Sequence, residues 1–537
     1  MAQTRPDTGT VIRETAPPVP GTLTPRLPMP VLPKPPAPRV ATPPARFVLK
    51  SVVVSGNTVF KGAVLHPYAL DWFGREIALA DLEQIAQRIT DHYRRAGYFL
   101  AQVVIPPQGI RNGSVEILVV EGSLGRVRVE RDPGTPVPER LTDRMLERLP
   151  RNQPLTTQAL EHAMLLLADL PGLNVQSALE QGEKPGTTDL VITLQSSRRW
   201  DLSLDVDNHG SRSVGEYRFG VLGRIRSPLA LGDNLDLRLL RSSGADLTFG
   251  RLGYELPVNA HGTRAGIALS RIQYELGRDF AALDATGTAN ILDATVTHPL
   301  IRGRAENLFA KAGWMEKRLE DRLGSLDSTA NKRSRVMNAG LTYEVRDTYL
   351  GGGYNSASVS GSLGELKILS SEDLATDQSA TGHRTHGSFA KLNYQFSRLQ
   401  WISADSTLHL GLAGQATNKN LDSSEKLAMG GPAGVRAYPS SEGIIDDGQV
   451  ANIEYRYSFT HAFTGSAFYD LAHGRVNYEA LPNEENERSL RGYGLGVRWT
   501  EGGFSIRASL AWRDSPAARS ETGDRYPRLF AQMIKAF

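Results

Sequence analysis

The chain is 537 residues long, carries a formal net charge of +3 and contains no cysteine. Its length exceeds what one ordinary hydrophobic core holds, so we expect two or more structural units. The nearly neutral charge argues against nucleic-acid binding, and the absence of cysteine excludes disulfides, thiolate metal sites and cysteine nucleophiles.

Residues 1–45 are predicted to form a proline-rich tail or linker. Twelve of the 28 residues from Pro17 to Pro44 are proline, a composition typical of extended polyproline II. The segment is either a disordered spacer or a functional tether. The opening residues, MAQTRPDTGTVIRE, lack the charged-then-apolar layout of a signal peptide, so the chain is either cytoplasmic or a mature form without its leader.

Residues 46–122 alternate strand and helix patterns on the scale of one small module. The stretch FVLKSVVVSGNTVF indicates a strand that ends in a Gly-Asn turn signal. A helix is predicted over ALADLEQIAQRITDHYRRAGYF because apolar residues recur on one stripe, namely Leu82, Ile85, Ala86, Ile89 and Tyr93. Two strands, AQVVIP and VEILVVEG, close the module.

Residues 123–198 repeat this order. A strand at LGRVRVE is followed by helices at PERLTDRMLERL and TTQALEHAMLLLADL, and then by strands at NVQSALE and TDLVITLQ. We therefore predict two β-α-α-β-β modules, and neither shows a catalytic constellation. No apolar run approaches the ~20 residues that a membrane-spanning helix needs.

The remainder of the chain follows a period of two. Ile453, Tyr455 and Tyr457, for example, alternate with Glu454 and Arg456. A soluble sandwich shows the same alternation, so no single strand decides the fold class. The length of the tract does decide it, because an open sheet of this size would expose long edges unless it closed into a barrel.

Residues 199–537 are therefore predicted to form a transmembrane β-barrel. Alternation on ~10-residue strands is typical of outer-membrane barrels, and a spacing of ~21 residues per strand and loop allows about sixteen strands. Half of each strand would face a wet lumen, which agrees with the mean hydropathy of −0.30. The predicted fold is mainly β, with two small α+β modules before the barrel, and it favours a chain whose leader has been removed.

Three stretches resemble a known family of such barrels, the two-partner secretion (TpsB-type) transporters of the haemolysin/haemagglutinin secretion-activation family. GNTVF, from Gly56, resembles the opening of a POTRA domain. DLSLDVDNHGSRSVGEYRFG, from Asp201, resembles the first barrel hairpin, and LGDNLDLRL, from Leu231, the next strand entry. The resemblance covers residues 46–537 and implies that the two modules are POTRA domains.

A fourth stretch, GGPAGVRAYPSSEGIIDDG, resembles the lumenal-loop motif of that family. The motif core is usually Val-Arg-Gly-Tyr or Val-Arg-Gly-Phe, and here it consists of Val435, Arg436, Ala437 and Tyr438. Alanine disfavours a positive φ, so we expect the loop tip to differ in detail. The resemblance implies that a loop at about 421–448 folds back into the barrel lumen.

The same resemblance implies that the loop arginine pairs with an aspartate of a Phe-x-Asp motif on the barrel wall. Phe468 and Asp470 match that motif. Independently, Ala467, Tyr469 and Leu471 form the apolar face of the predicted strand, so Phe468 and Asp470 should point into the lumen. The alternative is that the arginine is exposed on an extracellular loop.

The two ends of the chain carry further features that bear on the resemblance. Its members often carry an N-terminal helix that plugs the pore. Residues 1–16 are short and contain Pro6 and Gly9, which disfavour such a helix, so a short plug is kept as the alternative to a plain tail. The chain ends in Phe537, and by resemblance a terminal aromatic is the signal that the barrel-insertion machinery reads.

Other short motifs are weak. His383 and His386 form an H-x-x-H in a loop context without a carboxylate pattern, which favours a solvated loop over a metal site. The S-x-x-K at 423–426 has no companion motifs, so we interpret it as chance. Asp446 and Asp447 are expected to cap a turn that leads into the next strand.

The resemblance implies a transporter in the outer membrane of a Gram-negative bacterium. Its periplasmic POTRA domains would recognise an unfolded secreted exoprotein (TpsA-type), and its barrel would translocate that exoprotein without ATP. Outer-membrane lipid and the barrel-assembly machinery would be further partners, and no cofactor, metal or catalytic residue is expected. The alternatives are a barrel-assembly factor of the same superfamily, which usually has more POTRA modules, and a passive porin, which has none.

Overall fold

The computed structural model describes residues 6–15, 46–110, 112–151, 153–244, 247–440, 442–482, 484–521 and 525–537. It divides into a unit that contains the two small modules and a unit that contains the sheet-forming remainder together with the N-terminal helix. The predicted polyproline segment lies outside the described residues. Within the described residues, none of the helices has both the length and the apolar composition needed to cross a bilayer.

The first module packs helices against one small sheet. Its elements are β1 (Phe47–Val48), β2 (Ser51–Ser55), α2 (Gly62–Leu65), η1 (His66–Trp72), β3 (Glu76–Ile77), α3 (Leu79–Arg95), β4 (Gln102–Val104) and β5 (Ser114–Val120). The sheet order is β2-β5-β4, with β2 parallel to β5. All five apolar residues of the predicted stripe on α3 are buried, so this stripe forms the helix side of the core.

The buried carboxylate of Glu121 fixes the position of the GNTVF turn. Glu121 accepts hydrogen bonds from the backbone N–H groups of Thr58 (2.7 Å) and Val59 (2.8 Å) and from the Tyr93 hydroxyl (2.8 Å). Burial alone would raise the pKa of Glu121, but the hydrogen bonds from Thr58, Val59 and Tyr93 outweigh it and hold that pKa below its usual value. The carboxylate thus ties the turn after β2 to α3 and to the end of β5.

The second module repeats this architecture. Its elements are β6 (Ser123–Arg131), α4 (Glu139–Leu146), α5 (Thr157–Ala168), β7 (Leu173–Gln181) and β8 (Thr187–Ser196), in the sheet order β6-β8-β7. The Thr156 hydroxyl caps α5 by accepting from the Ala159 N–H. One face of the sheet packs on the helices, and the other carries ion pairs such as Arg126 with Glu183 at 2.6 Å.

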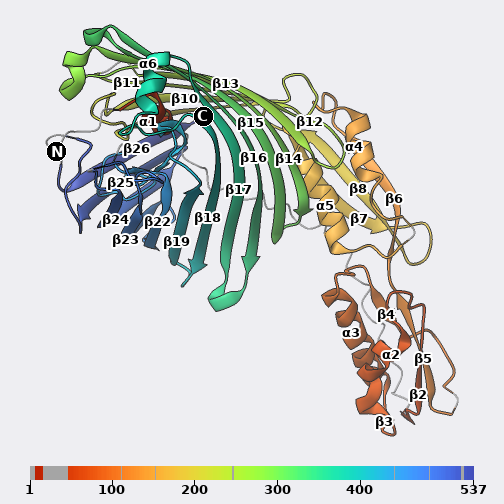
Figure 1. Cartoon of the computed structure of the whole chain (residues 1–537). Coiled ribbons are helices and arrows are strands. Elements are labelled where there is room, and N and C mark those ends of the chain that lie inside the picture. The colour runs from red at the N-terminus through yellow and green to blue at the C-terminus, as the bar shows by residue number, and fades with distance from the viewer. Residues whose placement is uncertain are drawn as a thin grey trace. The chain divides into compact units, whose positions relative to one another are not determined.

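Sixteen strands of the described chain close into an antiparallel barrel, as predicted (Figure 1). They are β9 (Trp200–Asp207), β10 (Arg218–Arg226), β11 (Asn234–Ser242), β12 (Thr248–Pro257), β13 (Arg264–Glu275), β14 (Ala285–Arg302), β15 (Glu306–Leu323), β16 (Ser328–Asp347), β17 (Gly353–Ile368), β18 (Gly387–Trp401), β19 (Ser406–Thr417), β22 (Asp447–Ser458), β23 (Phe463–Arg475), β24 (Glu487–Glu501), β25 (Phe504–Arg513) and β26 (Arg528–Ala536). The last strand pairs with the first, which leaves no free sheet edge.

The predicted alternation holds on the barrel wall. Ile453, Tyr455 and Tyr457 point outward and are 41–44% exposed, which suits a lipid-facing surface. Lys535, which interrupts the apolar face of the last strand, donates from Nζ to the Gly502 carbonyl (2.8 Å). The same Nζ lies 4.0 Å from the centre of the Phe504 ring, so this charge is accommodated at the barrel rim.

The long connection between β17 and β18 folds on itself through one aspartate. It contains α6 (Ser371–Asp377), and the Asp377 carboxylate accepts from the N–H groups of Thr385 (3.0 Å) and His386 (3.1 Å). Nδ1 of His386 accepts from the Ile368 N–H (3.2 Å), so the H-x-x-H histidine serves the loop backbone.

Candidate functional site

The connection between β19 and β22 folds into the barrel instead of over its rim. It contains η5 (Ser423–Glu425), β20 (Leu427–Ala428) and β21 (Ile444–Ile445), and the two short strands pair with each other. Gly431 adopts a φ of +93°, and a Cβ there would lie 2.9 Å from the Cα of Ser440, so only glycine fits this turn. We call this connection, residues 418–446, the lumenal loop.

The tip of the lumenal loop is held by Arg436. Its Nε and Nη2 each lie 2.9 Å from a different carboxylate oxygen of Asp470 on β23, and its backbone N–H donates to the same carboxylate (3.1 Å). Nη1 donates to Glu454 on β22 (2.5 Å). Asp470 is fully buried, so the arginine is its charge partner inside the barrel.

The neighbours of this pair complete its hydrogen bonding. The Arg436 guanidinium stacks on the Phe468 ring, 3.3 Å from the ring centre. Asn452 donates to Asp470 (2.8 Å) and to the Gly434 carbonyl (3.0 Å), which joins the wall to the loop backbone. The structure therefore brings together three residues singled out in the sequence, Arg436, Phe468 and Asp470.

Ala437 does not alter the loop tip in the way we expected. Its φ is not among the positive values of the described residues, so no glycine is required at this position. Its methyl group packs against Gly492 on β24, where an added Cβ would lie only 2.5 Å from that of Ala437. The methyl is accommodated by a glycine on the wall.

The far side of the tip is bound to the connection between β25 and β26. Tyr438 is fully buried, and its hydroxyl donates to the Pro516 carbonyl (2.7 Å). Glu442, which the sequence analysis did not single out, accepts from the N–H groups of Arg519 (2.7 Å) and Ser520 (2.9 Å) and pairs with Arg488. Val435 and Tyr438 also join an apolar cluster with the barrel wall.

The base of the lumenal loop is fastened by ion pairs on the opposite wall. Glu425 bonds to Lys317 on β15 and to Lys391 on β18, each at 2.8 Å, and Asp422 bonds to Lys332 on β16 at 2.8 Å. Glu425 and Asp422 are buried. Glu425 and Lys426, which lie within the S-x-x-K at 423–426, therefore anchor the loop, and the interpretation of that motif match as chance stays a prediction.

Asp446 also differs from its predicted role. Its carboxylate lies 3.3 Å from Nζ of Lys426 and accepts from the backbone N–H groups of Leu421 (3.2 Å) and Tyr478 (2.9 Å). These donors come from distant segments, so Asp446 joins the two ends of the lumenal loop to a neighbouring connection and does not cap a local turn. Asp447 accepts from Thr417 (2.6 Å).

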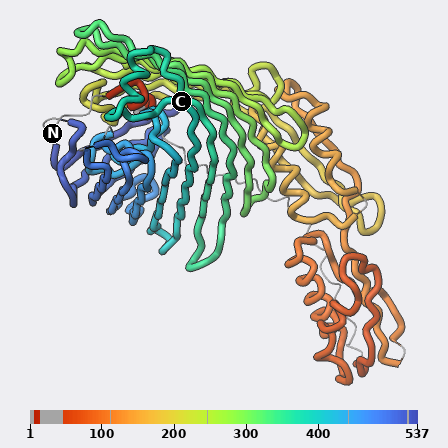
Figure 2. Tube along the Cα trace, viewed as in Figure 1, coloured from red at the N-terminus to blue at the C-terminus, as the bar shows by residue number. Residues whose placement is uncertain are grey.

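The N-terminal region forms a short helix, the alternative that Pro6 and Gly9 disfavoured. α1 (Thr8–Glu14) begins at Asp7, whose carboxylate caps it by accepting from the Thr10 N–H (3.0 Å). Figure 2 shows α1 as a red segment among the barrel strands. Val11 is fully buried in a cluster with inward-facing side chains of β11, β12 and β13.

Contacts to the wall and to the lumenal loop hold this short helix. The backbone N–H of Thr8 donates to Asp321 on β15 (2.9 Å), and Arg13 donates to the carbonyls of Ser423 and Lys426. A Cβ on Gly9 would lie 2.2 Å from the Ser423 hydroxyl, so the glycine that we counted against a helix allows α1 to pack against η5. Both α1 and the lumenal loop occupy the lumen and contact each other.

The last predicted site residue lies at the barrel seam. The Phe537 N–H donates to the Leu202 carbonyl on β9 (2.9 Å), one residue beyond the end of β26. Glu442, by contrast, carries no local sequence signal, because its partner Arg488 lies 46 residues away. Glu454 pairs with Arg456 on its own strand and with Arg436 on the lumenal loop. A glutamate on a strand face opposite an apolar face is the one hint available for Glu454.

Comparison with known proteins agrees with this architecture. A profile of the ShlB-type POTRA domain matches residues 47–122, and a profile described as haemolysin secretion/activation protein ShlB/FhaC/HecB matches residues 186–499. The heme/hemopexin transporter protein HuxB of Haemophilus influenzae (strain 86-028NP) is 27% identical over 483 residues, which cover 87% of this chain and 83% of HuxB. The outer membrane transporter CdiB of Escherichia coli O6:K15:H31 (strain 536 / UPEC) is 28% identical over 199 residues, which cover 37% of this chain and 33% of CdiB.

Solved structures show the same fold. CdiB from Escherichia coli aligns with a TM-score of 0.70 at 20% identity, covering 98% of this chain and 95% of its own. BamA from Haemophilus ducreyi lacking POTRA domains 1-3 aligns with a TM-score of 0.54 at 15% identity, covering 91% of this chain and 100% of its own. The chain belongs to the haemolysin secretion/activation (ShlB/FhaC/HecB) family and is an outer-membrane transporter of the TpsB type.

Proposed function

We propose that the barrel is closed at rest by α1 and the lumenal loop, and that an unfolded exoprotein captured by the periplasmic modules passes through it once these elements move. The observation that carries this proposal is the anchoring of Arg436, which makes three hydrogen bonds to Asp470 and one to Glu454 and so holds the loop tip inside the lumen. No step requires catalysis or ATP in this scheme, and refolding of the cargo outside the cell would supply direction.

The first module is the proposed capture site because its sheet offers open edges with exposed valines on them. β2 and β4 are edge strands, and an extended peptide can add to such an edge through backbone hydrogen bonds. Val53 on β2 and Val104 on β4 are 53% and 41% exposed. The outer face of the second module carries ion pairs instead, including Arg128 with Glu180, so it is less suited to an unfolded apolar client.

Deletion of residues 46–122 tests the transporter function. We expect secretion of one exoprotein to stop while the amount of barrel in the outer membrane stays unchanged. As a finer test, Val53→Asp should weaken capture by placing a charge beside the open edge, whereas Gln84→Asp is the matched control, since it adds the same charge at an exposed position of α3 away from the sheet. Normal secretion by the deletion strain would contradict the proposal.

Two other functions would give different results in the same deletion strain. A barrel-assembly factor, which the likeness to BamA keeps open at the level of fold, would lose many unrelated barrels at once. A passive porin would be indifferent to the loss of the module. We further propose that the barrel-assembly machinery inserts this barrel by reading the strand that ends at Phe537, which substitution of that residue by serine would test through barrel yield.

A further inference from the structure

The outer surface of the barrel carries a row of basic residues next to its apolar band. Arg271 on β13 lies two residues from Leu269 and therefore shares its outward face, and Leu269 is 58% exposed. Across the sheet, Arg271 pairs in register with Gly250 on one side and Asn290 on the other. Arg318 and Arg333 continue the row on β15 and β16, where they face each other in register.

This row lies toward the extracellular ends of the strands. β9 leaves the periplasmic modules, so it starts on the periplasmic side and every second strand thereafter runs outward. β13 and β15 run in that direction, and Arg271 and Arg318 lie near their ends. The side chains therefore stand where the apolar band meets the headgroups of the outer leaflet.

The basic residues outnumber the acidic ones at this level. The two outward rows nearest to the apolar band carry five cations across β13 to β17, namely Arg271, Arg318, Arg333, Arg335 and Lys367. The same rows carry two acids. Glu316 bonds to Arg318 (2.9 Å) and Arg335 (2.8 Å), and Glu365 lies 3.3 Å from Lys367.

Two of these arginines have no partner among the residues that the structure describes. Within the described chain, neither Arg271 nor Arg333 makes a side-chain hydrogen bond or an ion pair, although Nε of Arg333 is shielded from solvent. A shielded guanidinium nitrogen without an acceptor is costly to leave unbonded, so an external anionic oxygen is the expected acceptor.

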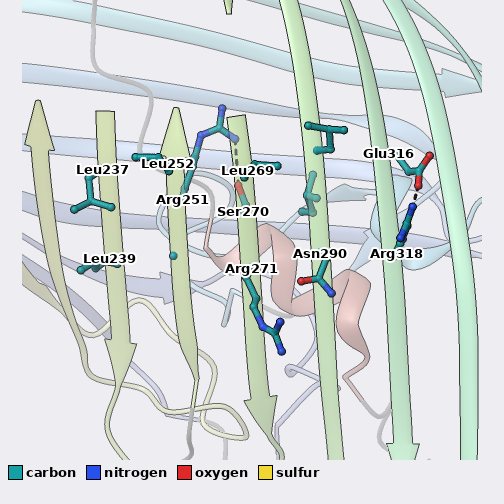
Figure 3. Close-up of a pocket in the computed structure, with 13 residues that line it drawn as sticks. Leu237, Leu239, Arg251, Leu252, Leu269, Ser270, Arg271, Asn290, Glu316 and Arg318 are labelled. Atoms are coloured by element: carbon teal, nitrogen blue, oxygen red, sulfur yellow. Dashed lines mark hydrogen bonds and ion pairs between the residues drawn. The ribbon is translucent and has the colours of Figure 1, made fainter. Parts of the chain in front are cut away.

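An apolar groove opens directly beside the row (Figure 3). It has a volume of about 510 Å³. Gly250 lies among the residues that line it, and because glycine has no side chain the groove is open at this point. Leu237, Leu239, Leu252 and Leu269 line one part of the groove, whereas Arg271, Asn290 and Arg318 line another. The site therefore combines positively charged hydrogen-bond donors with an apolar groove that can hold an acyl chain.

We propose that this surface binds a phosphorylated glycolipid of the outer leaflet. Arg271, Arg318 and Arg333 donate to the headgroup phosphates, Asn290 donates to a sugar or phosphate oxygen, and an acyl chain lies in the groove over Gly250. Guanidinium groups suit phosphate because they donate two parallel hydrogen bonds, and the leucines suit hydrocarbon. This binding site is separate from the lumen and does not depend on the proposed transport function.

The test is a titration of the purified full-length protein in non-ionic detergent with bisphosphorylated lipid A, followed by native mass spectrometry. We expect saturable binding by the wild type, and binding about tenfold weaker for the double variant Arg271→Gln/Arg333→Gln, because two charge-assisted contacts are lost. The matched control is Arg278→Gln/Arg384→Gln. It removes two exposed loop arginines that likewise make no side-chain hydrogen bond or ion pair with the described residues, and it should bind like the wild type.

Two further arms separate the parts of the proposal. Inorganic phosphate at the same concentration should not compete, whereas the dephosphorylated glycolipid should bind weakly; competition by free phosphate would overturn the assignment to a lipid. Gly250→Leu fills the groove without removing a charge and should also weaken binding, and unchanged binding would overturn the acyl site. Equal binding by the double glutamine variant and the wild type would overturn the headgroup site, provided that heat-shifted gel mobility shows both barrels to be folded.

Discussion

Arg436 on the lumenal loop and Asp470 on β23 form a forked ion pair, in which Nε and Nη2 each lie 2.9 Å from a separate carboxylate oxygen. The aspartate is fully buried and the arginine side chain is 14% exposed. Removing Arg436 would leave Asp470 as an unpaired charge in the lumen, whereas removing Asp470 would leave Arg436 with Glu454 as its remaining partner. The pair is therefore the point at which a single substitution should release the loop tip.

Arg436→Ala and Asp470→Ala should each abolish most secretion while the barrel still inserts. Breaking one side of a buried pair costs about 3–5 kcal/mol, and less where lumenal water reaches the charge. The two defects should be far from additive in the double variant, since both remove one contact. Thermal unfolding and secretion assays measure this, and additive losses would show that the residues act independently.

The same hairpin offers a matched control for that experiment. Arg475 pairs with Asp447 at 2.6 Å, but its side chain is 48% exposed. Exposed pairs contribute roughly 0–1 kcal/mol, so Arg475→Ala should leave both unfolding temperature and secretion nearly unchanged. A comparable loss at this exposed pair would mean that charge removal on the hairpin, and not release of the loop, causes the defect.

Gly9→Val should dislodge α1 from the lumen. A Cβ at this position would lie 2.3 Å from the backbone nitrogen of Ser424, which cannot move freely because the adjacent Asp422 and Glu425 are held by lysines. We expect higher ion conductance in a planar bilayer. The same substitution at Gly361, which has open space around it on β17, should leave conductance unchanged.

Replacing residues 430–443 by a short flexible linker should increase conductance further. This segment is held in the lumen by contacts of Arg436, Tyr438 and Glu442, so its removal opens the space that it fills. Single-channel recording of the wild type, the Gly9 variant and the loop variant compares the two obstructions. An unaltered conductance in the loop variant would place the segment outside the conducting path.

Ala437→Gly should have almost no effect, whereas Gly492→Leu should disturb the loop tip. Ala437 does not need a positive φ, so the change to glycine removes one methyl contact and costs about 0.5–1 kcal/mol. A side chain at position 492 would collide with that methyl at 2.5 Å. Secretion and heat resistance of the two variants measure the difference, and a stronger defect in Ala437→Gly would refute the packing explanation.

The first module should lose stability in acid through Glu121. Its pKa in the folded state lies below the usual value, so the folded state is stabilised above the unfolded pKa of about 4.3, and this stabilisation is lost as the pH falls through the folded pKa. Hydrogen exchange of residues 46–122 in the full chain, at pH 7 and in steps from about pH 5 down to about pH 2, measures the change. Glu121→Gln should be less stable at pH 7 and should lack this acid dependence.

Much of the fold was predictable because its signals are local. Ile453, Tyr455 and Tyr457 face lipid since successive residues of a strand point to opposite sides, and this rule needs no knowledge of neighbours. The stripe on α3 from Leu82 to Tyr93 likewise identified its buried face through helical spacing alone. The period of the pattern, counted over the length of the chain, was enough to indicate a closed barrel of about sixteen strands.

The contents of the lumen were decided by tertiary structure. α1 is seven residues long and contains Gly9, so it is too short to be stable by itself, and it exists because Asp321 and the lumenal loop supply its partners from more than 300 residues away. Glu425 and Glu442 are ordinary residues until Lys317 and Arg488 are brought opposite them. Sequence patterns report which face of an element is buried, whereas a specific buried ion pair depends on two distant segments meeting, and that is settled only when the barrel closes around them.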